Sequence, residues 1–373
     1  MTLKRLLPAL AGVALFATAC GSAADQVADE AVPASAESST IEASTDAAAA
    51  TPNEVIVDAE PLAFAIQSIE DSSYSFEQGL TMELDLFGEP VTIGTDGAFV
   101  TGQFDDGQSV VNADIGSFIG SVIEPFGIEG DNPLFGPLLE PLTSAELDLW
   151  STEDTIVIDL SEFASAIGVL DPTAATELDL FTNGPVSIDI DQLIELGVDP
   201  TIDGADLASQ FGGAQISGPS DIAATLRAID VLDDAGTDVV DGVDVSVFTG
   251  EVSLAEYVEA TGAGVDSQFG PLGNLGLDPS GIDPATALES FDDIVVDVTL
   301  MIDGDDLVRQ VITNIDMTPI FEDLADVGGP GLDSEGTFLV ESWVTFDNYG
   351  ADFDIVLPDA VDVTSEIAGQ LDS

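Results

Sequence analysis

The stretch that decides the fold is IVVDVTLMIDGDDLVRQVITNIDM, residues 294–317. Apolar and polar residues alternate over 294–302 and again over 307–317, which predicts two strands that each bury one face. The acidic, glycine-containing segment 303–306 between them predicts a tight turn. Strands joined by a short turn pair antiparallel, so this stretch predicts an antiparallel hairpin. Two further strands are predicted at 337–346 and 351–357.

A second hairpin-like phrase occurs three times upstream. Each copy begins Glu-Leu-Asp-Leu followed by an aromatic residue, and a second alternating run follows it. Strict alternation of apolar and acidic residues predicts strands with one buried and one solvated face. Since the copies are unevenly spaced, they predict a meander with insertions rather than a solenoid. The strand pairs predicted in this way are 83–87 with 91–93, 146–150 with 156–160, and 177–181 with 186–190.

Helices are predicted between these strands. PLAFAIQSIE (61–70) has Pro61 in its first turn, and a helix capped by Ser220 has an apolar stripe that ends at Leu232. Shorter helices are predicted at 253–261 and 284–291, and a strand at 243–252 follows the turn Asp241-Gly242. The fold class is therefore α+β: a curved antiparallel β-sheet whose concave apolar face is covered by helices.

The N-terminus has the layout of a bacterial export signal. Lys4 and Arg5 precede an apolar stretch that ends in Ala17-Thr18-Ala19-Cys20, and this predicts a signal peptide over residues 1–19. Cys20 is the only cysteine and stands where lipoproteins are acylated. Two or three acyl chains there, palmitate among them, would anchor the protein stably on the extracytoplasmic side of the cell membrane. A secreted protein with a cysteine after its cleavage site is the alternative.

The rest of the chain divides by composition. Residues 20–56 carry the lipidated cysteine and an acidic Ala/Ser/Thr-rich tether, for which we expect disorder. Residues 57–373 are expected to form a single α+β domain with insertions. The apolar insertion 114–141 either forms a lid over a cavity or packs as a loop on the sheet, and we expect the loop.

Charge excludes several classes of function. The chain has 72 acidic and four basic residues, a formal net charge of −68. Processing would leave Arg227 and Arg309 as the only cations, so nucleic acid is excluded as a partner, and so is unassisted adsorption to anionic lipid. Each arginine is expected to pair with carboxylates, and contact with a lipid head group is the alternative. We expect a monomer.

The same composition bears on catalysis and metal binding. The chain has no histidine, and its only lysine lies in the signal peptide. Catalysis by Ser-His-Asp or Cys-His groups and by Schiff bases is thereby excluded. A pair of carboxylates acting on a glycoside is possible in principle, but an acid-rich surface explains the carboxylates better. No metal site and no cofactor are predicted.

Two blocks resemble a known family. FLVESWVTFDNYGADFDIVLPDAVDV (338–363) resembles the closing strands of the LppX/LprG lipoproteins of actinobacteria, with Thr345, Asp347, Tyr349, Gly350 and Pro358 at the matching positions. VVDGVDVSVFTGEVSL (239–254) resembles a strand pair of the same family. The resemblance implies a half-barrel of the LolA-like lipid-carrier type that holds an acylated lipid in a hydrophobic cavity. This chain is longer than those proteins and lacks basic residues that could meet a phosphorylated head group.

From this resemblance we expect a non-enzymatic cell-envelope lipoprotein that binds, and transfers, acylated lipids. A structural or adhesive surface lipoprotein with a solid core is the alternative, since alternating strands bury apolar faces in most proteins. The residues expected to line the ligand site lie on the apolar faces of the predicted strands. They are Leu84, Leu86, Leu147, Leu149, Leu178, Leu180, Ile188, Val298 and Leu300.

Overall fold

The structure is a computed structural model of the 373-residue chain. It describes residues 60–86, 89–95, 97–123, 140–152, 154–170, 178–196, 219–229, 231–260, 294–319, 337–365 and 367. Cys20, the tether, the helix expected at 284–291 and residues 124–139 of the apolar insertion lie outside the described residues.

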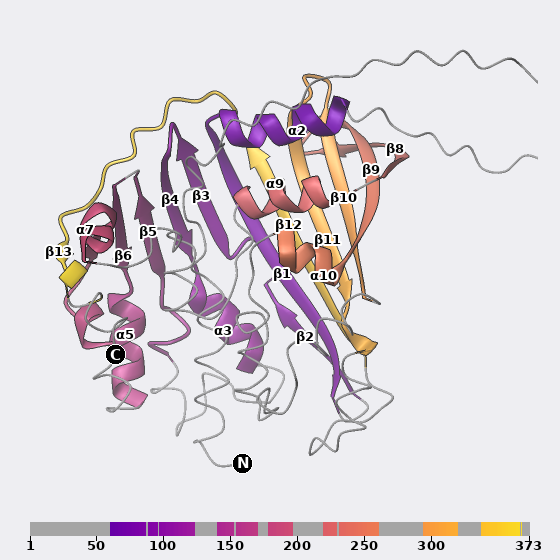
Figure 1. The fold of residues 1–373 in the computed structure, drawn as a ribbon. Helices are drawn as coiled ribbons and strands as arrows, with labels where there is room; N and C mark the ends of the chain where they lie inside the picture. Colours follow the sequence, from indigo (N-terminus) through magenta and orange to yellow (C-terminus); the bar gives the residue numbers. More distant parts are fainter. Residues whose placement is uncertain are drawn as a thin grey trace, which may run out of the picture.

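A single sheet organises the described part of the chain (Figure 1). Its path runs β13-β7-β6-β5-β4-β3-β1-β12-β11-β10-β9-β8, and β2 pairs with β1 beside that path. The pairs are antiparallel except for the parallel pair of β13 and β7, and the two end strands, β13 and β8, do not pair with each other. The strands are β1 (Tyr74–Leu86), β2 (Glu89–Gly94), β3 (Val100–Asp105), β4 (Gln108–Ala113), β5 (Leu147–Ser151), β6 (Thr155–Asp159), β7 (Val186–Asp189), β8 (Leu232–Val240), β9 (Val243–Ser253), β10 (Val295–Asp303), β11 (Val308–Asp316), β12 (Phe338–Asp347) and β13 (Val361–Asp362).

Strand register separates an apolar from a polar face. Phe76 on β1 lies opposite Phe346 on β12, while its neighbour Glu77 lies opposite Thr345. Because successive side chains of a strand point to opposite faces, Phe76 and Phe346 share the apolar face. Glu77 and Thr345 share the polar one. The predicted curved, mostly antiparallel sheet is therefore confirmed.

Helices cover the apolar face, around which the sheet arches (Figure 1). We call this face concave and the opposite one convex. Buried side chains such as Ile69, Leu226 and Tyr257 join the helices and the strands in one hydrophobic cluster. Three helices pack together over one arm of the sheet: α2 (Glu60–Asp71), α9 (Pro219–Ala228) and α10 (Leu254–Ala260). At the other arm lie α5 (Ser161–Leu170), η4 (Asp179–Phe181, a 3-10 helix) and α7 (Ile190–Glu195), while α3 (Ile115–Ile123) contacts β2.

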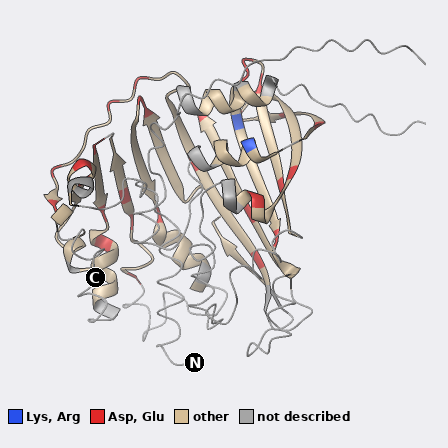
Figure 2. Ribbon diagram, viewed as in Figure 1, with Lys and Arg blue, Asp and Glu red and all other residues tan. Residues whose placement is uncertain are grey.

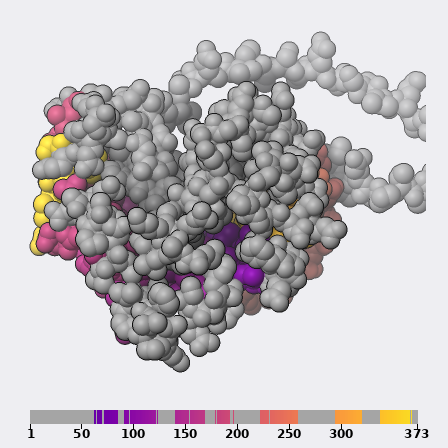
Figure 3. All heavy atoms as spheres, turned by 90° about the horizontal axis from the view of Figure 1, so that it is seen from below, coloured from indigo at the N-terminus to yellow at the C-terminus, as the bar shows by residue number. Residues whose placement is uncertain are grey.

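The view from below shows the same order of elements along the sheet (Figure 3). Magenta and yellow residues at one end belong to the helices beside β6 and to the C-terminal segment, and salmon residues at the other end belong to β8 and β9. The indigo residues of the N-terminal strands lie between them. The sheet thus continues on both sides of β1.

Several predicted elements are confirmed. Residues 295–303 and 308–316 form the β10–β11 hairpin. Residues 83–86 pair with 89–92 in β1 and β2, and 148–151 pair with 156–159 in β5 and β6. The turn between β8 and β9 has φ 49° at Asp241 and φ 84° at Gly242, as a two-residue type I′ hairpin turn requires. Part of the apolar insertion, expected as a loop, is the helix α3.

Two predicted strands and one helix end are wrong. The described residues 178–181 do not pair with 186–190 as predicted, because that partner is β7 and its two edges pair with β6 and β13; residues 179–181 form η4 instead. Residues 351–357 do not pair either, since β12 already lies between β1 and β11. That segment runs along one end of the strands toward β13 (Figure 1). The helix predicted from Ser220 to Leu232 starts at Pro219 and ends at Ala228, and Leu232 begins β8.

Candidate functional site

The predicted ligand residues that lie on strands share the concave face. Leu147, Leu149, Ile188, Val298 and Leu300 are fully buried members of the hydrophobic cluster. Leu84 is partly buried against it. Leu86 is the last residue of β1, and its side chain lies outside the described ones. Leu178 and Leu180 also pack on the cluster but come from η4 and the residue before it, so their expected position on a strand was wrong.

These residues share a face but do not form one compact pocket. Leu147 and Leu149 lie on β5, whereas Val298 and Leu300 lie on β10. Strands β4, β3, β1, β12 and β11 separate the two pairs. Whether a lipid contacts any of these residues stays a prediction.

The sequence prediction missed a buried glutamine in the middle of the concave face. Gln78 on β1 is 4% exposed, and its neighbours across the strands are Val344 and Val100. Its side-chain oxygen, Oε1, is buried and has no hydrogen-bond partner among the described residues. The signal was present in the sequence, because Gln78 occupies an apolar position in the alternation of YSFEQGLTMELDL (74–86).

Aromatic rings close one end of the same face. The Tyr74 ring centroid lies 5.5 Å from that of Phe104, 5.3 Å from that of Phe346 and 5.8 Å from that of Tyr349. Tyr349 donates a hydrogen bond from its hydroxyl to the Val308 carbonyl at 2.8 Å, and burial raises the pKa of this hydroxyl. The group is therefore an uncharged, well-packed end wall.

Arg309 is held by carboxylates beside this wall. Its Nε donates to Asp303 Oδ2 at 2.7 Å, and its Nη1 lies 3.5 Å from Asp347 Oδ1. Burial alone would raise the pKa of Asp303, but hydrogen bonds from the Leu307 amide, the Arg309 guanidinium and the Asp305 amide outweigh it, and the pKa lies below its ordinary value. The expected pairing of Arg309 with carboxylates is confirmed. Arg309 lies on β11, and Arg227, which is exposed, lies in the last turn of α9. Figure 2 shows how few basic positions, in blue, the ribbon carries beside its acidic ones, in red.

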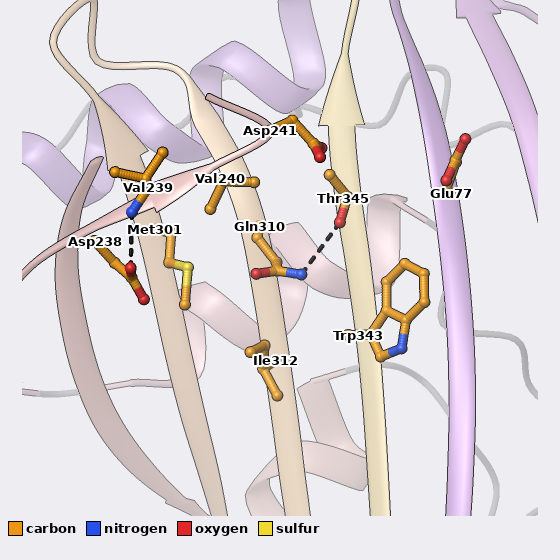
Figure 4. A pocket seen from close by; sticks show the side chains of 10 residues that line it. All are labelled: Glu77, Asp238, Val239, Val240, Asp241, Met301, Gln310, Ile312, Trp343 and Thr345. Carbon is orange, nitrogen blue, oxygen red and sulfur yellow. Dashed lines mark hydrogen bonds between the residues drawn. The ribbon is translucent and has the colours of Figure 1, made fainter. Parts of the chain in front are cut away.

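The convex face carries a separate groove of about 400 Å³ (Figure 4). It lies where the tip of the β8–β9 hairpin crosses strands β10, β11 and β12. Two adjacent cross-strand rows make up its floor. One row contains Met301, Gln310, Thr345 and Glu77, and the other contains Ile312 and Trp343. Asp238, Val239, Val240 and Asp241 complete the lining from the hairpin.

Trp343 is fixed in this groove by its partner across the strands. Its indole lies over Gly79 on β1, where an added Cβ would come within 2.4 Å of Cε2. Beside it, Gln310 Nε2 donates a hydrogen bond to Thr345 Oγ1 at 3.2 Å. Sequence reasoning missed this groove because residues from strands that are distant in the sequence line it, although Trp343 lies in the outward phase of its strand.

Metal sites and membrane spans were searched for in the same residues. Among the described side chains, no group of three or more Asp, Glu, His or Cys is placed to hold a metal ion. None of the helices in the described ranges has the length and apolar character that crossing a bilayer requires.

No protein-family model and no curated protein matches the chain. Its fold is similar to that of LprF from Mycobacterium bovis, at 12% identity, with a TM-score of 0.33 over 81% of this chain and 96% of that chain. The lipoprotein LppX from Mycobacterium tuberculosis matches at 11% identity, with a TM-score of 0.32 over 80% of this chain and 100% of that chain. A DUF1329 family protein from Desulfovibrio piger matches at 8% identity, with a TM-score of 0.20 over 80% and 94% of the two chains.

The expected resemblance to the LppX/LprG lipoproteins is thus confirmed as a likeness to two of their solved structures. The TM-scores lie below 0.5, so the likeness identifies neither a ligand nor a site in this chain.

Proposed function

We propose that this protein is a non-enzymatic lipoprotein of the cell envelope, anchored through Cys20, that binds and transfers an acylated lipid. The lipid would lie against the middle of the concave face, beside Gln78. The buried, unpaired Gln78 Oε1 is the single observation that carries this proposal.

A solid apolar core does not explain why a buried acceptor without a donor lies at this position. Leaving a buried acceptor without a donor costs about 1–3 kcal/mol, and a leucine would suit the apolar neighbours Val344 and Val100 better. Ligand sites, in contrast, are mostly apolar and contain a few polar groups that orient the ligand. A hydroxyl or amide hydrogen of a bound lipid would complete the hydrogen bonding of Gln78.

Solvent extraction of the purified full-length protein tests this function. Acyl chains linked to Cys20 stay with the precipitated protein, so the extract contains only non-covalent lipid. We expect mass spectrometry to find one lipid class, carrying a hydroxyl or amide hydrogen, enriched over the composition of the membrane from which the protein was purified.

The matched variants are Gln78→Leu and Gln103→Leu. Gln103 is exposed on the convex face of β3, so its replacement should leave the bound lipid unchanged. Loss of one hydrogen bond in Gln78→Leu should lower the retained lipid about two- to tenfold. An extract that merely repeats the membrane composition would instead support the structural or adhesive lipoprotein with a solid core.

A further inference from the structure

The groove on the convex face has the chemistry of a site for an organic cation with an apolar stem. We propose that it binds a lysine- or arginine-bearing segment of a partner polypeptide. This inference does not rest on lipid binding, because the groove and Gln78 lie on opposite faces of the sheet.

The floor of the groove suits the stem of such a side chain. Trp343, Ile312 and Met301 present apolar surface from three neighbouring strands, and Val239 and Val240 present more from the hairpin (Figure 4). Lysine and arginine bury their methylene groups along such surfaces and keep the charged end near water. A cation over an indole face is attracted by the ring itself. Trp343 is well placed for this role because it lies against the backbone of Gly79.

The rim of the groove suits the charge. Glu77, Asp238 and Asp241 contribute three carboxylates to the lining, and none of the residues that line it is basic. These carboxylates do not form one of the groupings that could hold a metal ion among the described residues. Spaced carboxylates around an aromatic ring instead match a guanidinium or ammonium group on a stem.

Strand β8 favours a polypeptide over a free small molecule. It is an end strand of the sheet and pairs with β9 alone among the described strands. Residues 233–239 are exposed, and Val239 is 56% exposed. An extended peptide can add to such an edge through backbone hydrogen bonds and direct alternate side chains to one face. The groove residues Asp238, Val239 and Val240 belong to the same strand.

Tryptophan fluorescence gives a direct test. The chain has two tryptophans, so a Trp150→Phe background leaves Trp343 as the only reporter in the full-length protein. The probe is an N-acetylated valine–arginine–valine–arginine–valine amide, and its control replaces arginine by the uncharged isostere citrulline. About 0.15 M salt limits long-range attraction to this acidic protein, since the Debye length is then about 8 Å. We expect a saturable change in Trp343 emission with the arginine peptide and binding at least about tenfold weaker with citrulline.

Matched charge variants distinguish binding in the groove from general electrostatic attraction to this acidic protein. Asp238→Asn with Asp241→Asn removes two carboxylates of the groove, and asparagine suits the positive φ of the turn at position 241. Asp352→Asn with Asp354→Asn removes two exposed carboxylates that do not line the groove. We expect the first pair to weaken binding about tenfold or more and the second to change it less than about twofold. Equal weakening by both pairs, or no saturable change in emission, would overturn the proposal.

Discussion

The indole of Trp343 covers Gly79, its direct partner across β12 and β1, so closely that an added Cβ would come within 2.4 Å of the ring. Phe76 covers Gly102 on the opposite face in the same way, again with a Cβ-to-ring distance of 2.4 Å. Glycine weakens a strand because it brings no side chain to pack. An aromatic partner across the strands compensates for this, and each glycine lets its ring lie against the sheet.

Gly79→Ala should therefore destabilise the protein although alanine is the smallest possible addition. The new methyl group would displace the Trp343 ring, and forced repacking of this kind costs about 1–3 kcal/mol. Denaturant unfolding measures the change in the free energy of unfolding. The emission of Trp343 in a Trp150→Phe background reports whether the ring moves.

Gly97→Ala is the matched control, since an added Cβ there meets no atom within 4 Å. We expect a change within about 0.5 kcal/mol. Equal stability of the two alanine variants would show that the Trp343 ring does not depend on Gly79.

Alternation predicted the parts of the fold that depend on local pairing. The β10–β11 and β1–β2 hairpins and the turn at Asp241-Gly242 all follow from neighbouring residues. The β3–β4 hairpin was missed although it carries the same signal: Asp106 and Gly107 both have positive φ, at 46° and 76°. That hairpin could have been predicted from its Asp-Gly turn.

Other features depend on which strand edges remain free, and no local pattern contains that information. Residues 177–181 and 351–357 alternate as strands do, yet the edges beside them are already paired. The convex groove is non-local for the same reason, because it brings Asp238, Met301 and Trp343 together from three strands. Gln78 lies between the two cases. The sequence shows that Gln78 occupies an apolar position of the alternation. It does not show that Oε1 lacks a hydrogen-bond partner among the described residues.

Gln78→Leu should stabilise the lipid-free protein. The substitution removes a buried acceptor that has no donor and leaves an apolar group between Val344 and Val100. A gain of about 1 kcal/mol in the free energy of unfolding is expected after lipid has been stripped. Gln103→Leu, on the exposed face, should change it by less than about 0.5 kcal/mol. A loss of stability in Gln78→Leu would mean that the side-chain oxygen has a donor in the lipid-free protein.

Cys20→Ser should release the protein from the membrane. The remaining chain carries 72 acidic residues and, once the signal peptide is removed, only two arginines, so an anionic bilayer repels it. Phase separation in a cloud-point detergent should move the protein from the detergent phase to the aqueous phase, and intact mass should show the loss of the acyl groups. Ser22→Ala, two residues along, should keep both properties. Membrane retention of Cys20→Ser would require a second anchor.

Asp303→Asn should destabilise the protein in a pH-dependent way. Asparagine keeps an acceptor for the Asp305 and Leu307 amides but loses the charge that pairs with Arg309 at 2.7 Å. A hydrogen bond between charged groups contributes about 1.5–3 kcal/mol, and we expect a loss in this range near pH 7, measured by denaturant unfolding. Asp347→Asn removes only the longer contact, at 3.5 Å from an exposed carboxylate, and should cost less than about 1 kcal/mol.

The direction of the pH dependence follows from the lowered pKa of Asp303 in the folded protein. A carboxyl with a lowered folded pKa stabilises the protein fully above its unfolded pKa, about 3.9. That contribution is lost as the pH falls through the folded pKa, because both states are then protonated. The difference between wild type and Asp303→Asn should accordingly be constant above about pH 5 and shrink steadily below about pH 4. The other carboxylates titrate in both proteins and cancel in this difference. A difference that persisted unchanged to pH 2 would show that the charge of Asp303 does not stabilise the fold.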